Sequence, residues 1–267
     1  MKTAGAYPVI TLTTDFGLRD EYVGLMKGVI HGINPVAPVI DLTHYIPPQD
    51  VLWTAHLIYY SFSYFPSGSV HVVVVDPGVG SSRKIMLVKA AGHYFLVPDN
   101  GLMTKVVAAY GADEIWSINN ARYFLDNISS TFHGRDIFAP VAAYLSTGVE
   151  PMVLGIRETE LYTLDIPEPD FTGKAIQGAV IHVDQFGNLI TNIEREQLRR
   201  LSVRYPELII EIGAHQLTGI AKSYLKVDKH QVVATIGSKG LLEISVNQGN
   251  AAEQLGFDKG EPVQVHN

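Results

Sequence analysis

The stretch Val73–Arg83, VVVDPGVGSSR, decides the expected architecture of the N-terminal part of the chain. Its run of valines is typical of a buried strand, and the strand pattern ends on Asp76. The chain then turns at Pro77-Gly78 and reaches Arg83 seven residues after the aspartate. Open α/β sheets bind ligands at the carboxyl ends of their strands, so Asp76 and Arg83 are candidates for function. A surface ion pair that closes a turn would show the same pattern.

Around this stretch, strand patterns alternate with helix patterns. Pro8–Thr13 and Pro38–Thr43 are short apolar runs, whereas Asp20–Ile33 and Asp50–Tyr64 carry apolar residues at three- and four-residue spacing. Asp20 is the expected cap of the first helix. The order strand, helix, strand, helix predicts a sheet with parallel strands and right-handed crossovers. Further strands are predicted at Ser69–Val75, Lys84–Ala90, Tyr94–Val97 and Glu114–Ile118, with Lys84–Ala90 returning beside Ser69–Val75.

The composition changes at Asp165–Asp170, DIPEPD, where two prolines and three acids without periodicity indicate a linker. Beyond it, short strand patterns alternate with turn residues. We therefore expect an α/β protein with a mixed, largely parallel sheet in an N-terminal domain, 1–164, a linker, 165–170, and a smaller, mainly antiparallel β-barrel domain, 171–267. The strands predicted there are Ala175–Val183, Leu189–Asn192, Leu208–Ile212, Gln216–Leu217, Val232–Ile236, Leu241–Ser245 and Val263–Val265.

Composition narrows the classes of function. A formal charge of -7 over 267 residues argues against a nucleic-acid or anionic-membrane partner. The absence of cysteine excludes disulfides, thiolate metal ligands and cysteine nucleophiles. The ten histidines form no obvious metal pair, and the chain has no Walker loop, no GxGxxG after a strand and no HExxH. Because Met1–Tyr7 lacks signal-peptide features and no long apolar run occurs, we expect a cytoplasmic protein.

Three further segments carry candidate polar residues. His133 precedes a glycine at an expected helix start, where free backbone donors lie, although lone histidines are usually structural. The segments Asp184–Asn188 and Ser238–Gly240 each interrupt a pair of predicted strands. Plain hairpin turns require the same residue types, so the pattern alone does not make either segment a binding site.

Seven motifs nevertheless occur in one order along nearly the whole chain. They are TLTTDFG at Thr11–Gly17, DEYVGLMKG at Asp20–Gly28, VDPGVGSSR at Val75–Arg83, PDNG at Pro98–Gly101, FHGRDIFAP at Phe132–Pro140, DQFGNLITNI at Asp184–Ile193 and GSKGLLEISVNQGNAA at Gly237–Ala252. In this order they resemble the S-adenosyl-L-methionine (SAM) hydrolase family, the SAM hydroxide adenosyltransferases. That family is similar to the SAM-dependent fluorinase and chlorinase.

The resemblance implies hydrolysis of SAM to adenosine and L-methionine, by attack of water or hydroxide on the ribose C5′ carbon. SAM is then the substrate, and no cofactor is expected. The catalytic set of the family maps onto Asp76, Arg83 and His133. A carboxylate and an imidazole can hold and polarise water, while the arginine orients the carboxylate and stabilises developing negative charge. The sequence leaves open whether Asp76 or His133 accepts the proton.

The resemblance also implies which residues bind the substrate. Asp15 would accept hydrogen bonds from the ribose hydroxyls, Asn188 would contact the adenine edge, and Tyr224 would stack on the base. Asp184 would pair with the methionine ammonium group, and Ser238 would bind the methionine carboxylate. The family places SAM between the N-terminal domain of one subunit and the C-terminal domain of the next, in a homotrimer.

Two departures from the fluorinase pattern affect the methionine contacts. Lys239 replaces an arginine, so a bidentate clamp on the carboxylate becomes a point charge, and the DQFGN motif is one residue shorter. A SAM-dependent halogenase is an alternative, but halogenases typically carry tyrosine at the position of Asp76, and a carboxylate would repel a halide. A non-catalytic SAM- or adenosine-binding protein is a second alternative, which would not require Asp76, Arg83 and His133 together.

Overall fold

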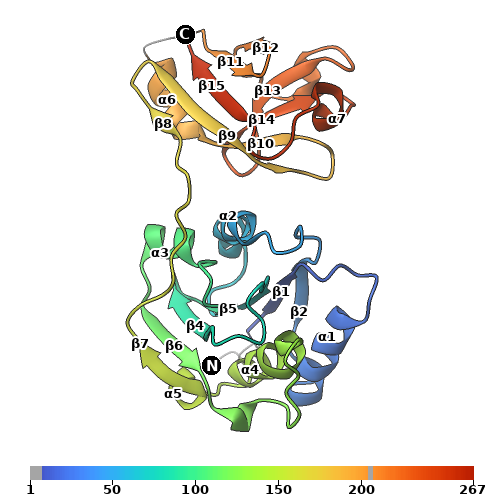
Figure 1. Ribbon diagram of the computed structural model, residues 1–267, viewed down its shortest axis with the longest axis vertical. Helices are drawn as coiled ribbons and strands as arrows, with labels where there is room; N and C mark the ends of the chain where they lie inside the picture. The colour runs from blue at the N-terminus through green and yellow to red at the C-terminus, as the bar shows by residue number, and fades with distance from the viewer. Residues whose placement is uncertain (1–7, 204–206) are drawn as a thin grey trace, which may run out of the picture. The chain divides into compact units, whose positions relative to one another are not determined.

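The computed structural model describes residues 8–203 and 207–267. The prediction made from Met1–Tyr7 concerns residues outside this range. The chain forms two compact units, and the division falls between Asp165 and Ile166 (Figure 1).

The first unit is built on a mixed sheet. Among the described residues it contains seven strands in the order β2-β1-β3-β5-β4-β6-β7. Pairing is parallel from β2 through β5 and antiparallel from β5 through β7, which confirms the predicted mixed sheet with a parallel core. The strands are β1 (Ile10–Thr14), β2 (Val39–Thr43), β3 (Val70–Val74), β4 (Ile85–Ala90), β5 (His93–Pro98), β6 (Glu114–Ile118) and β7 (Gly155–Glu158).

One predicted pairing is wrong: β4 does not lie beside β3. β5 is inserted between them, pairing parallel to β3 and antiparallel to β4. The cause is the two-residue turn at Ala91 and Gly92, which both adopt positive φ, 50° and 79°. Such turns match the twist of two adjacent antiparallel strands. β4 therefore folds back on β5, and β5 takes the position next to β3.

Helices cover both faces of this sheet (Figure 1). Val72 and Val74 of β3 pack in one cluster with residues of α1 and α4, whereas Val73 packs in a second cluster with residues of α2 and α3. Burial on both faces explains the unbroken run of valines. The helices are α1 (Tyr22–Ile33), α2 (Val51–Ser61), α3 (Thr104–Tyr110), α4 (Ala139–Ser146) and α5 (Pro151–Leu154), with short helical turns η1 (Phe62–Tyr64), η2 (Ala121–Tyr123) and the π-helical η3 (Gly134–Phe138).

The first two helices begin differently, and the cap predicted for the first is wrong. Asp20 does not cap α1, because the residue at the N-cap is Glu21 and its side chain makes no capping bond. Asp50 caps α2 by accepting a hydrogen bond from the Trp53 backbone N–H at 3.0 Å. That bond fixes the start of α2 one residue after the aspartate.

The second unit is an antiparallel, nearly closed barrel, as predicted. In its described part the strand order is β12-β11-β15-β9-β10-β14-β13, and β8 pairs with β9. Its strands are β8 (Asp170–Phe171), β9 (Ala175–Val183), β10 (Leu189–Glu194), β11 (Ile209–Ile212), β12 (His215–Thr218), β13 (Val232–Ile236), β14 (Leu241–Val246) and β15 (Pro262–His266). Two short helices, α6 (Arg195–Ser202) and α7 (Ala251–Leu255), and the 3-10 turn η4 (Tyr224–Lys226) were not predicted.

Candidate active site

Asp76 and Arg83 form a buried, bidentate ion pair at the end of β3. Arg83 Nε donates to Asp76 Oδ1 at 2.9 Å, and Arg83 Nη2 donates to Asp76 Oδ2. The two side chains are only 5% and 11% exposed, respectively. A surface ion pair would be solvated and would contribute little. This pair is instead held in a fixed orientation away from bulk water, because the planar guanidinium matches both carboxylate oxygens.

The loop between these two residues is shaped by its own hydrogen bonds. The Gly78 backbone N–H donates to Asp76 Oδ1 at 3.2 Å, and the Ser81 hydroxyl donates to the Gly78 carbonyl at 2.6 Å. Gly80 has φ of +78°, and a Cβ there would lie 2.5 Å from the Ser130 carbonyl oxygen. Only glycine allows both this conformation and this approach. The loop is thereby brought against the segment that leads to His133.

His133 completes the N-terminal set, the name used below for Asp76, Arg83 and His133. Arg83 Nη2 lies 3.1 Å from His133 Nδ1. Because a guanidinium can only donate, Nδ1 accepts, and the neutral ring carries its proton on Nε2. Burial first, and the Arg83 charge second, lower the pKa of His133 from its usual 6.5, while Asp76 and Asp136 act in the opposite direction. The imidazole is therefore neutral at pH 7.

The helical turn after His133 is a π-helix, η3. Asp136 is completely buried in it. Its carboxylate accepts from Arg135 Nε at 2.6 Å and from the Ser129 backbone N–H at 2.7 Å. Single π turns inside helices are frequent at functional sites. Here the turn begins directly after His133 and fixes the position of its backbone.

Asp15 lies at the same sheet edge as Asp76. It follows β1, which pairs parallel to β3 with Thr14 opposite Val74. Parallel neighbours bring their carboxyl ends together. Asp15 Oδ2 accepts one hydrogen bond, from the Gln49 backbone N–H at 2.9 Å. A carboxylate has about four acceptor positions, so Asp15 retains capacity for ribose hydroxyls.

In the second unit, Asp184 and Asn188 are bonded to each other within the β9–β10 turn. Asp184 Oδ1 accepts from the backbone N–H groups of Phe186 and Asn188, both at 2.9 Å. Its Oδ2 accepts from Asn188 Nδ2 at 2.8 Å. Gly187, with φ of +80°, packs so closely on Asn250 that a Cβ would clash. The geometry is that of a hairpin turn, and most of the acceptor capacity of Asp184 is used within it.

Tyr224 and Ser238 lie near the β13–β14 end of the barrel. The Tyr224 hydroxyl donates to Glu243 Oε2 at 3.1 Å, and Tyr224 is 39% exposed. Burial first, and then the Glu243 carboxyl, raise the pKa of Tyr224. Ser238 is exposed in the turn between β13 and β14. Sequence reasoning missed Glu243; the only signal was a charged residue inside the apolar run LLEISV.

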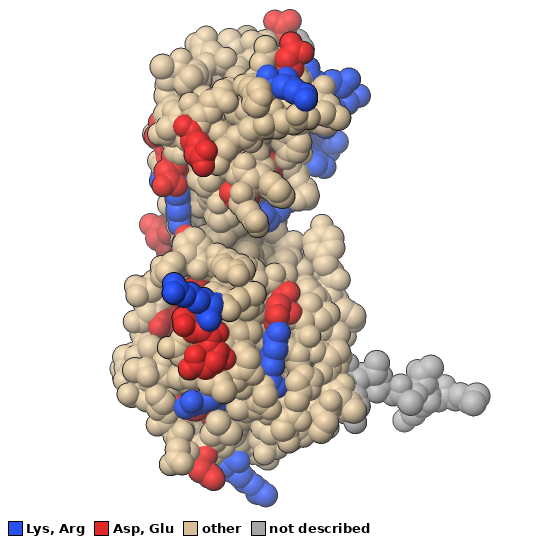
Figure 2. All heavy atoms as spheres, turned by 90° about the vertical axis from the view of Figure 1, so that its right-hand side faces the viewer, with Lys and Arg blue, Asp and Glu red and all other residues tan. Residues whose placement is uncertain are grey.

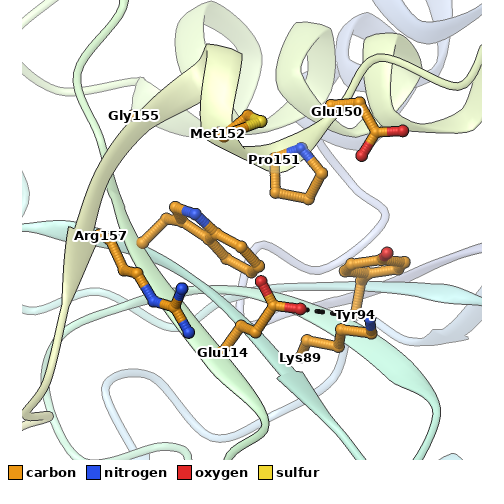
Figure 3. A pocket seen from close by; sticks show the side chains of 9 residues that line it. Lys89, Tyr94, Glu114, Glu150, Pro151, Met152, Gly155 and Arg157 are labelled. Atoms are coloured by element: carbon orange, nitrogen blue, oxygen red, sulfur yellow. Dashed lines mark hydrogen bonds and ion pairs between the residues drawn. The ribbon is translucent and has the colours of Figure 1, made fainter.

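A separate cavity of about 270 Å³ lies over the antiparallel edge of the first sheet (Figure 3). β4, β5, β6, β7 and α5 supply its lining, and Lys89 Nζ donates to Glu114 Oε1 at 3.4 Å within it. None of the predicted site residues line this cavity. It therefore adds nothing to the candidate site at the carboxyl ends of β1 and β3.

Three observations concern the described residues as a whole. In the ranges 8–203 and 207–267, no group of three or more His, Asp or Glu side chains could hold a metal ion. None of the helices in these ranges has the length and apolar character needed to cross a bilayer. On the face drawn in Figure 2, acidic and basic side chains are interspersed on each unit, without an extended basic surface of the kind that binds nucleic acids.

Comparison with known proteins agrees with this architecture. Residues 10–155 match the SAM hydroxide adenosyltransferase N-terminal domain, and residues 178–264 match the C-terminal domain of the same family. The chain is 37% identical to the (R)-S-adenosyl-L-methionine hydrolase of Methanocaldococcus jannaschii over 96% of its own length and 95% of that protein's. It is 26% identical to the fluorinase of Nocardia brasiliensis, with 98% of each covered.

Two solved structures share the fold of this chain. An uncharacterized conserved protein from Thermotoga maritima superimposes with a TM-score of 0.91 at 39% identity, over 97% of this chain and 100% of that one. A conserved hypothetical protein from Thermus thermophilus gives a TM-score of 0.75 at 31% identity, over 97% and 99%. The chain therefore belongs to the SAM hydroxide adenosyltransferase family.

Proposed function

We propose that this protein hydrolyses (R)-S-adenosyl-L-methionine to adenosine and L-methionine. Four (R)-S-adenosyl-L-methionine hydrolases are 34–37% identical over nearly the whole chain, whereas the fluorinases are 24–26% identical. The observation that carries the proposal is the continuous hydrogen-bonded set formed by Asp76, Arg83 and His133. Binding SAM alone would not require this buried arrangement of acid, guanidinium and imidazole.

The reaction requires the enzyme to position and deprotonate the nucleophile. The sulfonium leaves as the neutral thioether of methionine, so the leaving group needs no proton. Water or hydroxide must lie in line with the C5′–S bond, and a water molecule must lose a proton as the new bond forms. The new C5′–O bond takes its electrons from the nucleophile, and the C5′–S electrons remain on sulfur.

The hydrogen bonds of the N-terminal set suggest a division of these tasks. Nδ1 of His133 is occupied by Arg83, so the neutral ring offers only its Nε2–H, which can donate to the nucleophilic oxygen. Asp76 accepts three hydrogen bonds, two from Arg83 and one from the Gly78 backbone N–H, which leaves one of its about four acceptor positions for the nucleophile. We therefore assign proton acceptance to Asp76 and orientation of the oxygen to His133. Arg83 holds both groups and stabilises negative charge that develops between them.

The same residues oppose halogenation. A halide needs a dry site lined by donors, and the Asp76 carboxylate would repel it. We keep the substrate contacts as proposals: they are Asp15 to the ribose hydroxyls, Asn188 to the adenine edge, Tyr224 against the adenine face, Asp184 to the methionine ammonium group and Ser238 to the methionine carboxylate. We also propose a homotrimer, in which neighbouring subunits complete each SAM site.

The test is product analysis with a matched variant. Wild-type protein incubated with SAM should release adenosine and L-methionine in equal amounts, detected by chromatography. Asp76→Ala should lose about 10² to 10⁴ in kcat, the usual contribution of a general base. Ser82→Ala, in the exposed part of the same loop, is the control and should retain activity. Equal rates for wild type and Asp76→Ala, or a halogenated nucleoside formed with added chloride or fluoride, would overturn the proposal.

A further inference from the structure

The turn that carries Asp15 is held by the segment that follows β2. The Gly17 backbone N–H donates to the His44 carbonyl at 2.7 Å. The Gln49 backbone N–H donates to Asp15 Oδ2 at 2.9 Å, and Gln49 adopts a positive φ of 65°. Residues other than glycine seldom adopt this conformation, and those that do cluster at functional sites. The position of Asp15 therefore depends on residues 44–49.

His44 is a buried imidazole that the mechanism above does not use. It is only 2% exposed, and its Nδ1 lies 2.9 Å from the Thr14 hydroxyl oxygen. Its Nε2 lies 3.1 Å from Asp41 Oδ1, at an angle that falls short of a hydrogen bond, so Asp41 acts there chiefly through its charge. Lys27 Nζ donates to the other oxygen of Asp41 at 2.6 Å. Polar groups on both ring nitrogens thus set the orientation of the imidazole.

The direction of the hydrogen bonds leads from this imidazole to Asp15. The Asp41 carboxylate favours the neutral tautomer of His44 that carries its proton on Nε2. Nδ1 then accepts from the Thr14 hydroxyl. The Thr14 oxygen in turn accepts from the Phe16 backbone N–H at 3.2 Å. Because Thr14 and Phe16 are the chain neighbours of Asp15, these bonds fix the backbone on both sides of the carboxylate.

A second buried histidine–threonine pair on β1 offers a direct comparison. His71 Nδ1 lies 2.9 Å from the Thr11 hydroxyl oxygen, and His71 is 1% exposed. Thr11 lies three residues before Thr14, toward the opposite end of β1, and pairs with His71 of β3. The two pairs have the same chemistry and similar burial. They differ in that the pair of His44 and Thr14 adjoins a proposed substrate contact.

We propose that His44 is a positioning residue for Asp15, an inference that rests on the proposed contact of Asp15 with the ribose hydroxyls of SAM. It acts through the Thr14 hydroxyl and through its own backbone carbonyl. A carboxylate that accepts from two hydroxyls must be closely oriented, because hydrogen bonds weaken steeply as their angles depart from linear. Correct orientation should therefore raise the affinity for ribose ligands and leave ligands without these hydroxyls unaffected.

The experiment compares adenosine with 2′,3′-dideoxyadenosine by calorimetry. The two ligands share the base and differ in the two hydroxyls, so the ratio of their affinities measures the ribose contact. Asp15→Ala should lower this ratio by about 10- to 100-fold, the usual range for hydrogen bonds to a charged group. His44→Leu and Thr14→Val should each lower it by about 3- to 10-fold, because the carboxylate remains but is less well oriented. The double variant should lower it no further, since both residues act through one hydrogen bond.

His71→Leu is the matched control. It breaks the other buried pair of β1 and should lower the thermal unfolding temperature as His44→Leu does, but leave the affinity ratio unchanged. Equal weakening of both ligands in His44→Leu, an unchanged ratio in Thr14→Val, or the same fall in ratio in His71→Leu would overturn the proposal. An unchanged ratio in Asp15→Ala would overturn it as well, because the ribose contact would be absent. If the ratios behave as expected but SAM yields no adenosine, the hydrolase function fails while the role of His44 stands.

Discussion

The N-terminal set and the β9–β10 turn both present a carboxylate, but they hold it differently. Asp76 is oriented by Arg83, which also reaches His133, fifty residues further along the chain. Asp184 is satisfied by groups no more than four residues away. A carboxylate held by a distant cation remains part of a network that can act on a ligand. A carboxylate closed on its own turn chiefly stabilises that turn, so the two acids should respond differently to substitution.

The largest effect is expected at Arg83, because one guanidinium joins both partners. Arg83→Lys would keep the charge but lose the planar fork, so it could not bond Asp76 at two positions and His133 at the same time. We expect kcat to fall about 100-fold or more, with a smaller change in KM, since orientation of the nucleophile is lost. Steady-state kinetics with SAM measures both constants. A Lys variant with near wild-type kcat would show that charge alone suffices.

An intermediate effect is expected from pH. Activity requires neutral His133, whose Nδ1 accepts from Arg83, and protonation of Nδ1 would break that bond. Because burial and the Arg83 charge lower the pKa of His133 from its usual 6.5, the acid limb of kcat should have its midpoint below pH 6.5. His133→Asn should abolish this acid limb while lowering kcat at neutral pH. A wild-type acid limb centred above pH 6.5 would contradict the assignment.

The smallest catalytic effect is expected at Asp184. Asp184→Ala removes the acceptor for three hydrogen bonds of the turn, so the free energy of unfolding should fall by about 1–3 kcal/mol. Affinity for S-adenosyl-L-homocysteine should also fall, because Asp184 is proposed to pair with the methionine ammonium group. Chemical unfolding and calorimetry give the two quantities. Unchanged stability would contradict the role of Asp184 in holding the turn together.

Local patterns predicted much of the fold. The continuous valine run indicated a buried strand, and β3 is buried on both faces. The order of β4 and β5 was wrong because strand patterns do not say which strand a hairpin pairs against. Helix α6 was missed even though Glu194 and Gln197 form a capping box at its start. In a domain of short strands, one capping signal did not outweigh the surrounding pattern.

Local sequence patterns likewise predicted only part of the candidate site. Asp76 and Arg83 could be singled out from a strand end and a seven-residue spacing, but no spacing rule connects them to His133. Only the resemblance to a family joined the three, and the hydrogen bonds give the tautomer of the imidazole. The burial of Glu243 was not predicted, because a charged residue in a strand ordinarily faces water. Its burial depends on how β10, β13 and β14 pack around it.

Hydrolysis of SAM in oxygen-18 water tests the central claim most directly. The account predicts that wild-type protein transfers one labelled oxygen to the 5′-hydroxyl of adenosine and none to L-methionine, as read by mass spectrometry of both products. That result requires attack of water at C5′, as proposed for the Asp76, Arg83 and His133 set. Adenosine without label, or label in another product, would contradict the account.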